Sequence, residues 1–175
     1  MGFDYSAVDG DAYFRLSPPG WSSVLYMLLD QAGLLDHEAR PQPMPPEIVA
    51  RFEEVGDESA WPLEGGDLSE LEREYFGFGP TDSAKAAMWK LRDNEPWIIT
   101  PREATVLADG VDRILSGDPA ADAPPGAHEI LDRYDVERDR QGVRREERDA
   151  ELRSLLSDFA EFCRRASLQG GFWSH

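Results

Sequence analysis

Apolar residues along this chain follow two patterns, one typical of strands and one typical of helices. The clearest change from the first to the second lies within residues 97–115. Residues 97–99 (WII) form a short apolar run that predicts a strand, and a helical pattern follows directly. We expect this helix to have Thr100 as its N-cap, Pro101 as its first residue and Glu103 reaching back to the cap. Six small or apolar side chains then share one helical face: Ala104, Leu107, Ala108, Val111, Ile114 and Leu115.

The helical period predicts further helices on both sides of this segment. Ser22 or Ser23 is expected to cap a helix that ends near Gln31, after Pro18, Pro19 and Gly20 have stopped a preceding strand. A strongly amphipathic helix is expected near the C-terminus, with its apolar face spread over residues 152–166. Shorter or more polar helical segments are expected at residues 46–55, 67–76, 81–92, 127–134 and 135–149.

Helical spacing also predicts which side chains are buried. It places Val49 and Leu71 on the inward faces of their short helices. Cys163 lies on the apolar face of the last helix, where a buried structural thiol is expected. The residues expected to be buried together in the main core are Leu107, Val111, Leu155, Phe159 and Phe162.

Together these elements predict an α+β fold: a mostly helical single domain over residues 1–175 with a small, two- to three-stranded sheet. The expected strands are 12–16, 97–100 and 171–174, and the last of them is expected at a sheet edge. Three segments that are rich in proline, glycine or small residues are expected to be exposed loops: 37–46, 56–66 and 117–126.

The charge of the chain is strongly negative and unevenly distributed. Its 35 acidic and 18 basic residues give a net charge of −17, and residues 1–80 hold 16 of the acidic but only four of the basic residues. Such a chain lacks the basic patch that direct binding to nucleic acid requires. The charge is compatible with a basic protein partner, and also with acidity that only keeps the protein soluble.

The sequence carries no pattern that indicates a particular chemistry. The three histidines, at positions 37, 128 and 175, lack the spacing of a zinc site, and we expect neither a metal nor another cofactor. The common hydrolase, metalloprotease and nucleotide-binding motifs are missing, so catalytic residues are not assigned and enzymatic activity stays open. No apolar run is long enough to span a bilayer, and the N-terminus lacks the features of a signal peptide, so we expect a cytoplasmic protein without membrane association.

Three segments resemble a family of small, uncharacterised bacterial proteins. They are YFRLSPPGWSSVLYMLLDQAG near the N-terminus, WIITPREATVLADGVDRIL in the middle and FAEFCRRASLQGGFWSH at the end. Together they cover about a third of the chain, and the shared residues are core and capping types. The resemblance therefore implies a fold, a domain of unknown function, and no particular activity.

Two functions from different classes remain open at this stage. The first is an acidic cytoplasmic protein of the immunity or inhibitor kind, which caps a basic protein such as a toxin. The second is a small enzyme or ligand-binding domain that uses carboxylates in a helical cleft. For the first, the expected partner-binding residues are Glu53, Glu54, Asp57, Glu58, Trp61, Glu64, Asp67 and Glu70, with Trp61 as an apolar anchor. Glu72 belongs to the same acidic stretch, and Glu74 lies at its edge.

Overall fold

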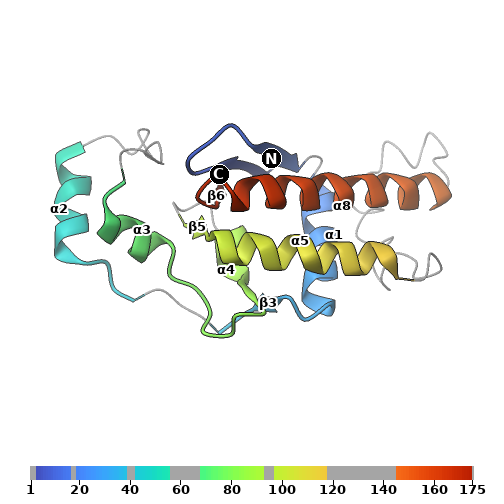
Figure 1. Ribbon diagram of the computed structural model, residues 1–175, viewed down its shortest axis with the longest axis horizontal. Helices are drawn as coiled ribbons and strands as arrows, with labels where there is room; N and C mark the ends of the chain where they lie inside the picture. The colour runs from blue at the N-terminus through green and yellow to red at the C-terminus, as the bar shows by residue number, and fades with distance from the viewer. Residues whose placement is uncertain are drawn as a thin grey trace.

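The computed structural model has the mostly helical α+β fold that the sequence predicts (Figure 1). The residues that it describes are 3–16, 19–38, 42–55, 68–92, 97–117 and 145–174. Its strands are β1 (Phe3–Ala7), β2 (Tyr13–Leu16), β3 (Leu35–Asp36), β4 (Ala86–Ala87), β5 (Ile98–Ile99) and β6 (Phe172–Ser174). Its helices are α1 (Pro19–Gln31), α2 (Pro46–Val55), α3 (Glu70–Phe76), α4 (Met88–Arg92), α5 (Pro101–Ser116) and α8 (Arg145–Ser167).

The main sheet has four antiparallel strands in the order β2-β1-β6-β5. The strand at residues 172–174 therefore lies inside the sheet, between β1 and β5, and its expected place at an edge is wrong. The sheet also has one strand more than expected, because β1 was not predicted. A second sheet joins β3 and β4 in parallel.

Helices cover both faces of the main sheet. Successive side chains of a strand point to opposite sides of a sheet, so the strands contribute side chains to both faces. On one face, Tyr5, Phe14 and Ile99 belong to the larger hydrophobic cluster, which is built with α1, α5 and α8. On the other face, Ile98 and Trp173 belong to a second cluster that includes residues from α2, α3 and α4. The four-stranded main sheet thus separates two apolar cores.

The larger core is centred on α5 and α8, which lie side by side and antiparallel (Figure 1). Leu107, Val111, Phe159 and Phe162 are buried there together, as predicted. Leu155 packs against the same core but stays partly exposed. Cys163 is also fully buried in this core, which confirms the expected structural thiol.

Two glycines make the turn from α8 into β6. Gly170 and Gly171 both have positive φ, 78° and 90°, which side chains with a Cβ rarely adopt. At Gly171 a Cβ would also collide with the carbonyl oxygen of Ile99. The turn therefore brings β6 against β5 in a way that only glycine permits.

Two predicted helices differ from those observed. α1 begins at Pro19, so the Pro-Gly segment expected to precede the helix forms its first turn, where proline is well tolerated. The helix expected at 81–92 covers only residues 88–92. Within the described residues, no helix is long and apolar enough to cross a membrane.

Candidate functional site

The site expected from the sequence centres on α2 and α3, which stand at one end of the molecule (Figure 1). α3 begins with a capping box: the hydroxyl of Ser69 accepts from the backbone N–H of Glu72, and the Glu72 carboxylate accepts from the Ser69 backbone N–H at 2.8 Å. Glu72 is only 1% exposed. Its expected place on the acidic surface is therefore wrong, and its role is internal.

Glu72 also connects the two helices. The same Oε2 that caps α3 accepts a hydrogen bond at 2.7 Å from Nη1 of Arg51 on α2. Ile48 on α2 is buried in the second hydrophobic cluster, whereas the other described side chains of this helix are exposed or only partly buried. Among the described side chains, Ile48 and the Arg51–Glu72 pair hold α2 beside α3, and Glu47, Val49, Ala50 and Glu53 of α2 are exposed.

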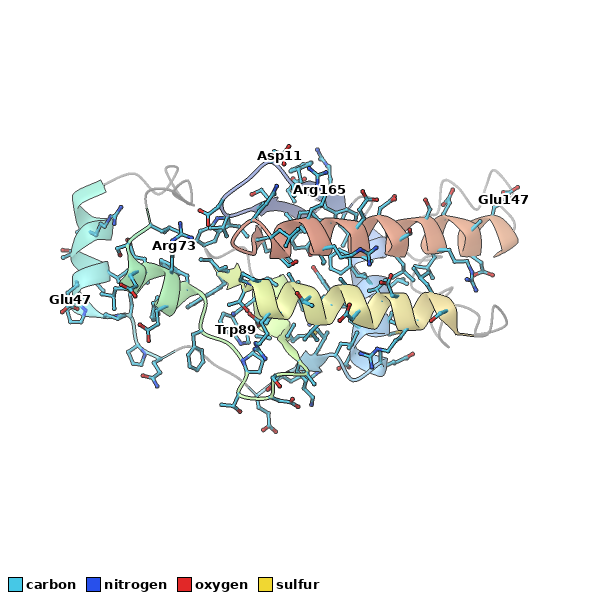
Figure 2. All side chains as sticks on the ribbon, in the orientation of Figure 1. Asp11, Glu47, Arg73, Trp89, Glu147 and Arg165 are labelled. Carbon is cyan, nitrogen blue, oxygen red and sulfur yellow. The ribbon has the colours of Figure 1, made fainter. Side chains whose placement is uncertain are left out.

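The open surface of these helices is acidic. Glu47 and Glu53 on α2, and Glu70 and Glu74 on α3, are exposed and make no ion pair with any described residue. Figure 2 shows Glu47 at the outer end of the molecule. Among the described residues, these four glutamates therefore carry negative charge that no basic side chain pairs with.

The two arginines of these helices are already engaged within the fold. Arg51 binds Glu72, and Arg73 makes two hydrogen bonds to Asp9, at 2.9 and 2.8 Å. Hydrogen bonding to Asp9 raises the pKa of Arg73, so this guanidinium stays charged and bound to its own partner. Neither arginine neutralises the exposed glutamates.

Apolar side chains lie among these carboxylates. Val49 is 38% exposed and Leu71 41% exposed, so their predicted inward positions are wrong. Phe78, which follows α3, is exposed to a similar extent. We give the name α2–α3 face to the exposed surface of the two helices, which includes six of these side chains: Glu47, Val49, Glu53, Glu70, Leu71 and Glu74. By helical spacing Val49 and Glu53 share one side of α2, and Glu47 lies on the other side.

The residues proposed from the sequence are only partly within the described structure. Glu53 and Glu70 are exposed on α2 and α3 and fit the proposed surface. Glu54 lies in α2, but its side chain is outside the described part. The remaining ones lie outside the described residues: Asp57, Glu58, Trp61, Glu64 and Asp67.

The site also contains features that sequence reasoning missed. Ser69 is one of the two N-caps that the sequence allows for this helix, with Asp67, but the burial of Glu72 was not expected. A glutamate three residues after such a cap turns back towards the helix start instead of pointing to solvent. The exposure of Val49 and Leu71 had no such signal. α3 has only seven residues, so helical periodicity alone does not decide which face it buries.

Glu103 is a second buried carboxylate, and it lies beside a buried lysine. Oε2 of Glu103 accepts a hydrogen bond from the backbone N–H of Thr100, the N-cap of α5. The same oxygen accepts from Nζ of Lys90 at 2.9 Å, and both side chains are fully buried. Lys90 also donates to the carbonyl oxygens of Gly77 and Ile98, at 3.1 and 2.9 Å. Burial lowers the pKa of Lys90, while Glu103 opposes that change.

This arrangement is suited to a structural role. A lysine ammonium has three N–H donors, and all three of its hydrogen bonds here are made to groups of the fold itself. The other Glu103 oxygen accepts from the backbone N–H of Ala87 at 3.0 Å. The pair therefore joins α4, β5 and α5 and presents nothing to a substrate.

Other reactive groups give no further site among the described residues. Burial raises the pKa of the Cys163 thiol well above its usual value, which disfavours the nucleophilic thiolate. In the part of the chain that the structure describes, no group of His, Cys, Asp and Glu is arranged to hold a metal ion.

Comparisons of the chain with protein-family models, with curated proteins and with solved structures give no match. The resemblance to a family of small bacterial proteins thus stays a prediction.

Proposed function

We propose that this chain is an acidic binding protein of the immunity or inhibitor kind, which caps a basic protein partner such as a toxin through the α2–α3 face. The observation that carries the proposal is the set of four exposed glutamates on two adjacent helices whose own arginines are bound elsewhere. A surface of this kind attracts a basic partner through charge complementarity.

The distribution of charge in the whole chain supports this proposal. Residues 1–80, which include α2 and α3, hold 16 acidic and four basic side chains. The more regular apolar helices, α5 and α8, belong to the other half and contribute to the larger core together with β1, β2 and α1. The excess of acidic residues therefore lies in the half of the chain that carries α2 and α3. The single cysteine, buried as a thiol, is typical of a reducing compartment, and we place the binding in the cytoplasm.

The test of this function is a pull-down from the native cytoplasm at low salt. We expect a basic protein to be retained by the wild-type chain. Neutralisation of the surface should lower the association rate constant of that complex by about tenfold or more. The neutralised variant carries four Glu→Gln substitutions, at Glu47, Glu53, Glu70 and Glu74. Salt should weaken the wild-type complex, because the Debye length falls from about 10 Å at 0.1 M to about 3 Å at 1 M.

The chain offers a control with the same change in net charge. Four other exposed carboxylates, outside α2 and α3, can be neutralised together: Glu38, Asp109, Asp158 and Glu161. This control variant should retain the partner nearly as well as the wild type. A partner lost equally by both variants would depend on total charge and not on the α2–α3 face, and recovery of an acidic partner would contradict the proposal.

The alternative, an enzyme or ligand-binding domain with carboxylates in a helical cleft, has no observation in its favour among the described residues. Glu72 and Glu103 are the two buried carboxylates there, and each caps a helix and binds a cation through its Oε2, although the Oε1 of Glu72 has no hydrogen-bond partner. Neither is positioned as a free acid or base.

A further inference from the structure

We propose that a second copy of this chain adds its β2 to the open edge of the main sheet, so that two sheets join as one through antiparallel β2 strands. The occupant of the edge is another molecule of the same protein, and the contact is symmetric. The interface lies on the hairpin of β1 and β2, and it does not depend on binding through the α2–α3 face.

β2 is the outermost strand of the main sheet, with β1 on one side and no described strand on the other. Figure 1 shows this hairpin, in dark blue, near the upper margin of the molecule. An edge strand presents unpaired backbone N–H and C=O groups, which can pair with a strand of another chain. Tyr13 is 58% exposed and the side chain of Arg15 63%, so solvent reaches β2.

The hydrogen bonds of β1 show how the backbone groups of the sheet are directed. The N–H of Ala7 donates to the carbonyl of Ala12 at 2.8 Å, on the β2 side. The N–H of Val8 donates to the carbonyl of Gly171 at 3.0 Å, on the β6 side. Successive residues of β1 therefore bond to β2 and β6 in turn, as an antiparallel ladder requires.

The same alternation fixes the direction of the backbone groups of β2. Tyr5 lies opposite Phe14 and, two residues from Ala7, it bonds to β2, so Phe14 turns its N–H and C=O towards β1. The neighbouring Tyr13 and Arg15 then point theirs away from β1. No described residue forms a backbone hydrogen bond with these outward groups, so they are free to bind another strand.

Antiparallel pairing of two β2 strands about Phe14 uses all of these outward groups. Tyr13 of each copy lies opposite Arg15 of the other, and the two residues exchange both of their backbone hydrogen bonds. Their side chains also meet on one face, where contact between a tyrosine ring and a guanidinium is attractive. A register centred on Arg15 would instead place like charges opposite each other. The residue pattern of β2 thus matches itself.

Charge favours a second copy over a basic partner at this edge. All three aspartates of the hairpin are paired with arginines: Asp4 with Arg15 at 3.7 Å, Asp9 with Arg73 at 2.8 Å and Asp11 with Arg165 at 3.1 Å. Two chains of net charge −17 can therefore meet here without bringing unpaired carboxylates together. A basic segment finds no unpaired carboxylate on these residues, in contrast to the α2–α3 face.

The test combines sedimentation equilibrium with amide hydrogen exchange on the full chain. We expect a monomer at about 1 μM and a largely dimeric protein at about 1 mM, the span of weak association through a small interface. In the dimer the amides of Tyr13 and Arg15 should become protected from exchange. The amides of Phe14 and Leu16, which bond to β1, should be protected at both concentrations.

A proline at position 13 tests the backbone pairing. It removes an outward N–H, which an edge strand tolerates, and leaves the ladder with β1 intact. Tyr13→Ser is the matched control, because it loses the same ring but keeps the N–H. Tyr13→Pro should raise the dissociation constant of the dimer by about tenfold or more relative to Tyr13→Ser, since the symmetric pair loses a hydrogen bond in each copy.

A charge reversal tests the side-chain contact. Arg15→Glu removes the cation that faces Tyr13 and leaves two carboxylates side by side with Asp4, so it should weaken the dimer. Arg113→Glu, at an exposed position of α5, gives the same change in net charge and should weaken it clearly less. Circular dichroism verifies that each variant is folded.

The outcomes are decisive without the variants as well as with them. A wild-type chain that stays monomeric at about 1 mM overturns the inference. A dimer in which the exchange of the Tyr13 and Arg15 amides does not change with concentration also overturns it, because another surface then forms the contact. Equal dissociation constants for Tyr13→Pro and Tyr13→Ser would exclude pairing through the strand edge. None of these results bears on the α2–α3 face, whose test is the retention of a basic partner.

Discussion

Two glutamates show how one side chain can hold several parts of this fold together. Glu72 and Glu103 each sit three residues after the N-cap of a helix, and each is buried. Each also binds a cation from an element earlier in the chain, Arg51 for Glu72 and Lys90 for Glu103. The cap fixes the carboxylate, and the carboxylate then positions the second element.

Replacing Lys90 with methionine tests the energetics of the enclosed pair. The substitution leaves the Glu103 carboxylate buried without its cation, so we expect the free energy of unfolding to fall by about 3–5 kcal/mol in a urea titration. Adding Glu103→Gln should restore much of this loss, because glutamine can still serve in the capping box. A loss below about 1 kcal/mol in the single variant would show that the buried Glu103 carboxylate is stable without the Lys90 ammonium.

The Thr100 hydroxyl provides a smaller contribution of the same kind. It accepts from the backbone N–H of Glu103 at 3.3 Å and donates to the Glu103 carboxylate at 2.8 Å. Thr100→Ala should therefore lower the free energy of unfolding by about 1 kcal/mol, and Thr100→Ser should retain most of the cap. Binding of a partner to the α2–α3 face should be unchanged in both, since Thr100 lies outside that face.

At the scale of elements, the sequence predicts best those helices that have one long apolar face. α5 and α8 meet this condition, and their main buried residues were predicted correctly apart from the partial exposure of Leu155. β1 was missed although its residues alternate, with Tyr5 and Ala7 buried and Asp4 and Ser6 less so. The alternation is thus present in the sequence itself, within an acidic N-terminal segment.

The helix expected at 81–92 failed for a different reason. Its apolar spacing suits a helix, but tertiary partners take the backbone N–H groups that a helix would use. Ala86 donates to the carbonyl of Leu34 at 2.8 Å, and Ala87 donates to Glu103 at 3.0 Å. Those partners lie about 50 residues before and 16 residues after, beyond what a local pattern reports.

The packing of α8 against the sheet gives a direct prediction. Phe159 is fully buried, with ring centres 5.4 Å from Phe14 and 6.4 Å from Tyr5. Phe159→Ala should lower the free energy of unfolding by about 3–5 kcal/mol, because it removes buried surface and leaves a cavity. Leu155→Ala, one turn earlier and only half-buried, should cost clearly less, and equal losses would contradict the packing described here.

At the scale of the molecule, the charge of the chain opposes its own compact state. The net charge of the chain is −17, and several arginines are held in exposed or partly exposed ion pairs with aspartates. Exposed pairs of this kind contribute little, typically about 0–1 kcal/mol each. We therefore expect repulsion among the unpaired carboxylates to outweigh the attraction within these pairs.

The thermal midpoint of unfolding should accordingly rise with ionic strength. Between 0.05 and 1 M sodium chloride, screening reduces repulsion among exposed carboxylates more than it weakens the buried Lys90–Glu103 pair. The variant with Glu→Gln at Glu47, Glu53, Glu70 and Glu74 should start from a higher midpoint at low salt and gain less from added salt. This comparison separates charge screening from the general stabilising effect of salt on apolar burial, which both proteins share. A midpoint that falls with salt in the wild type would mean that the ion pairs, and not the repulsion, dominate the electrostatics of the fold.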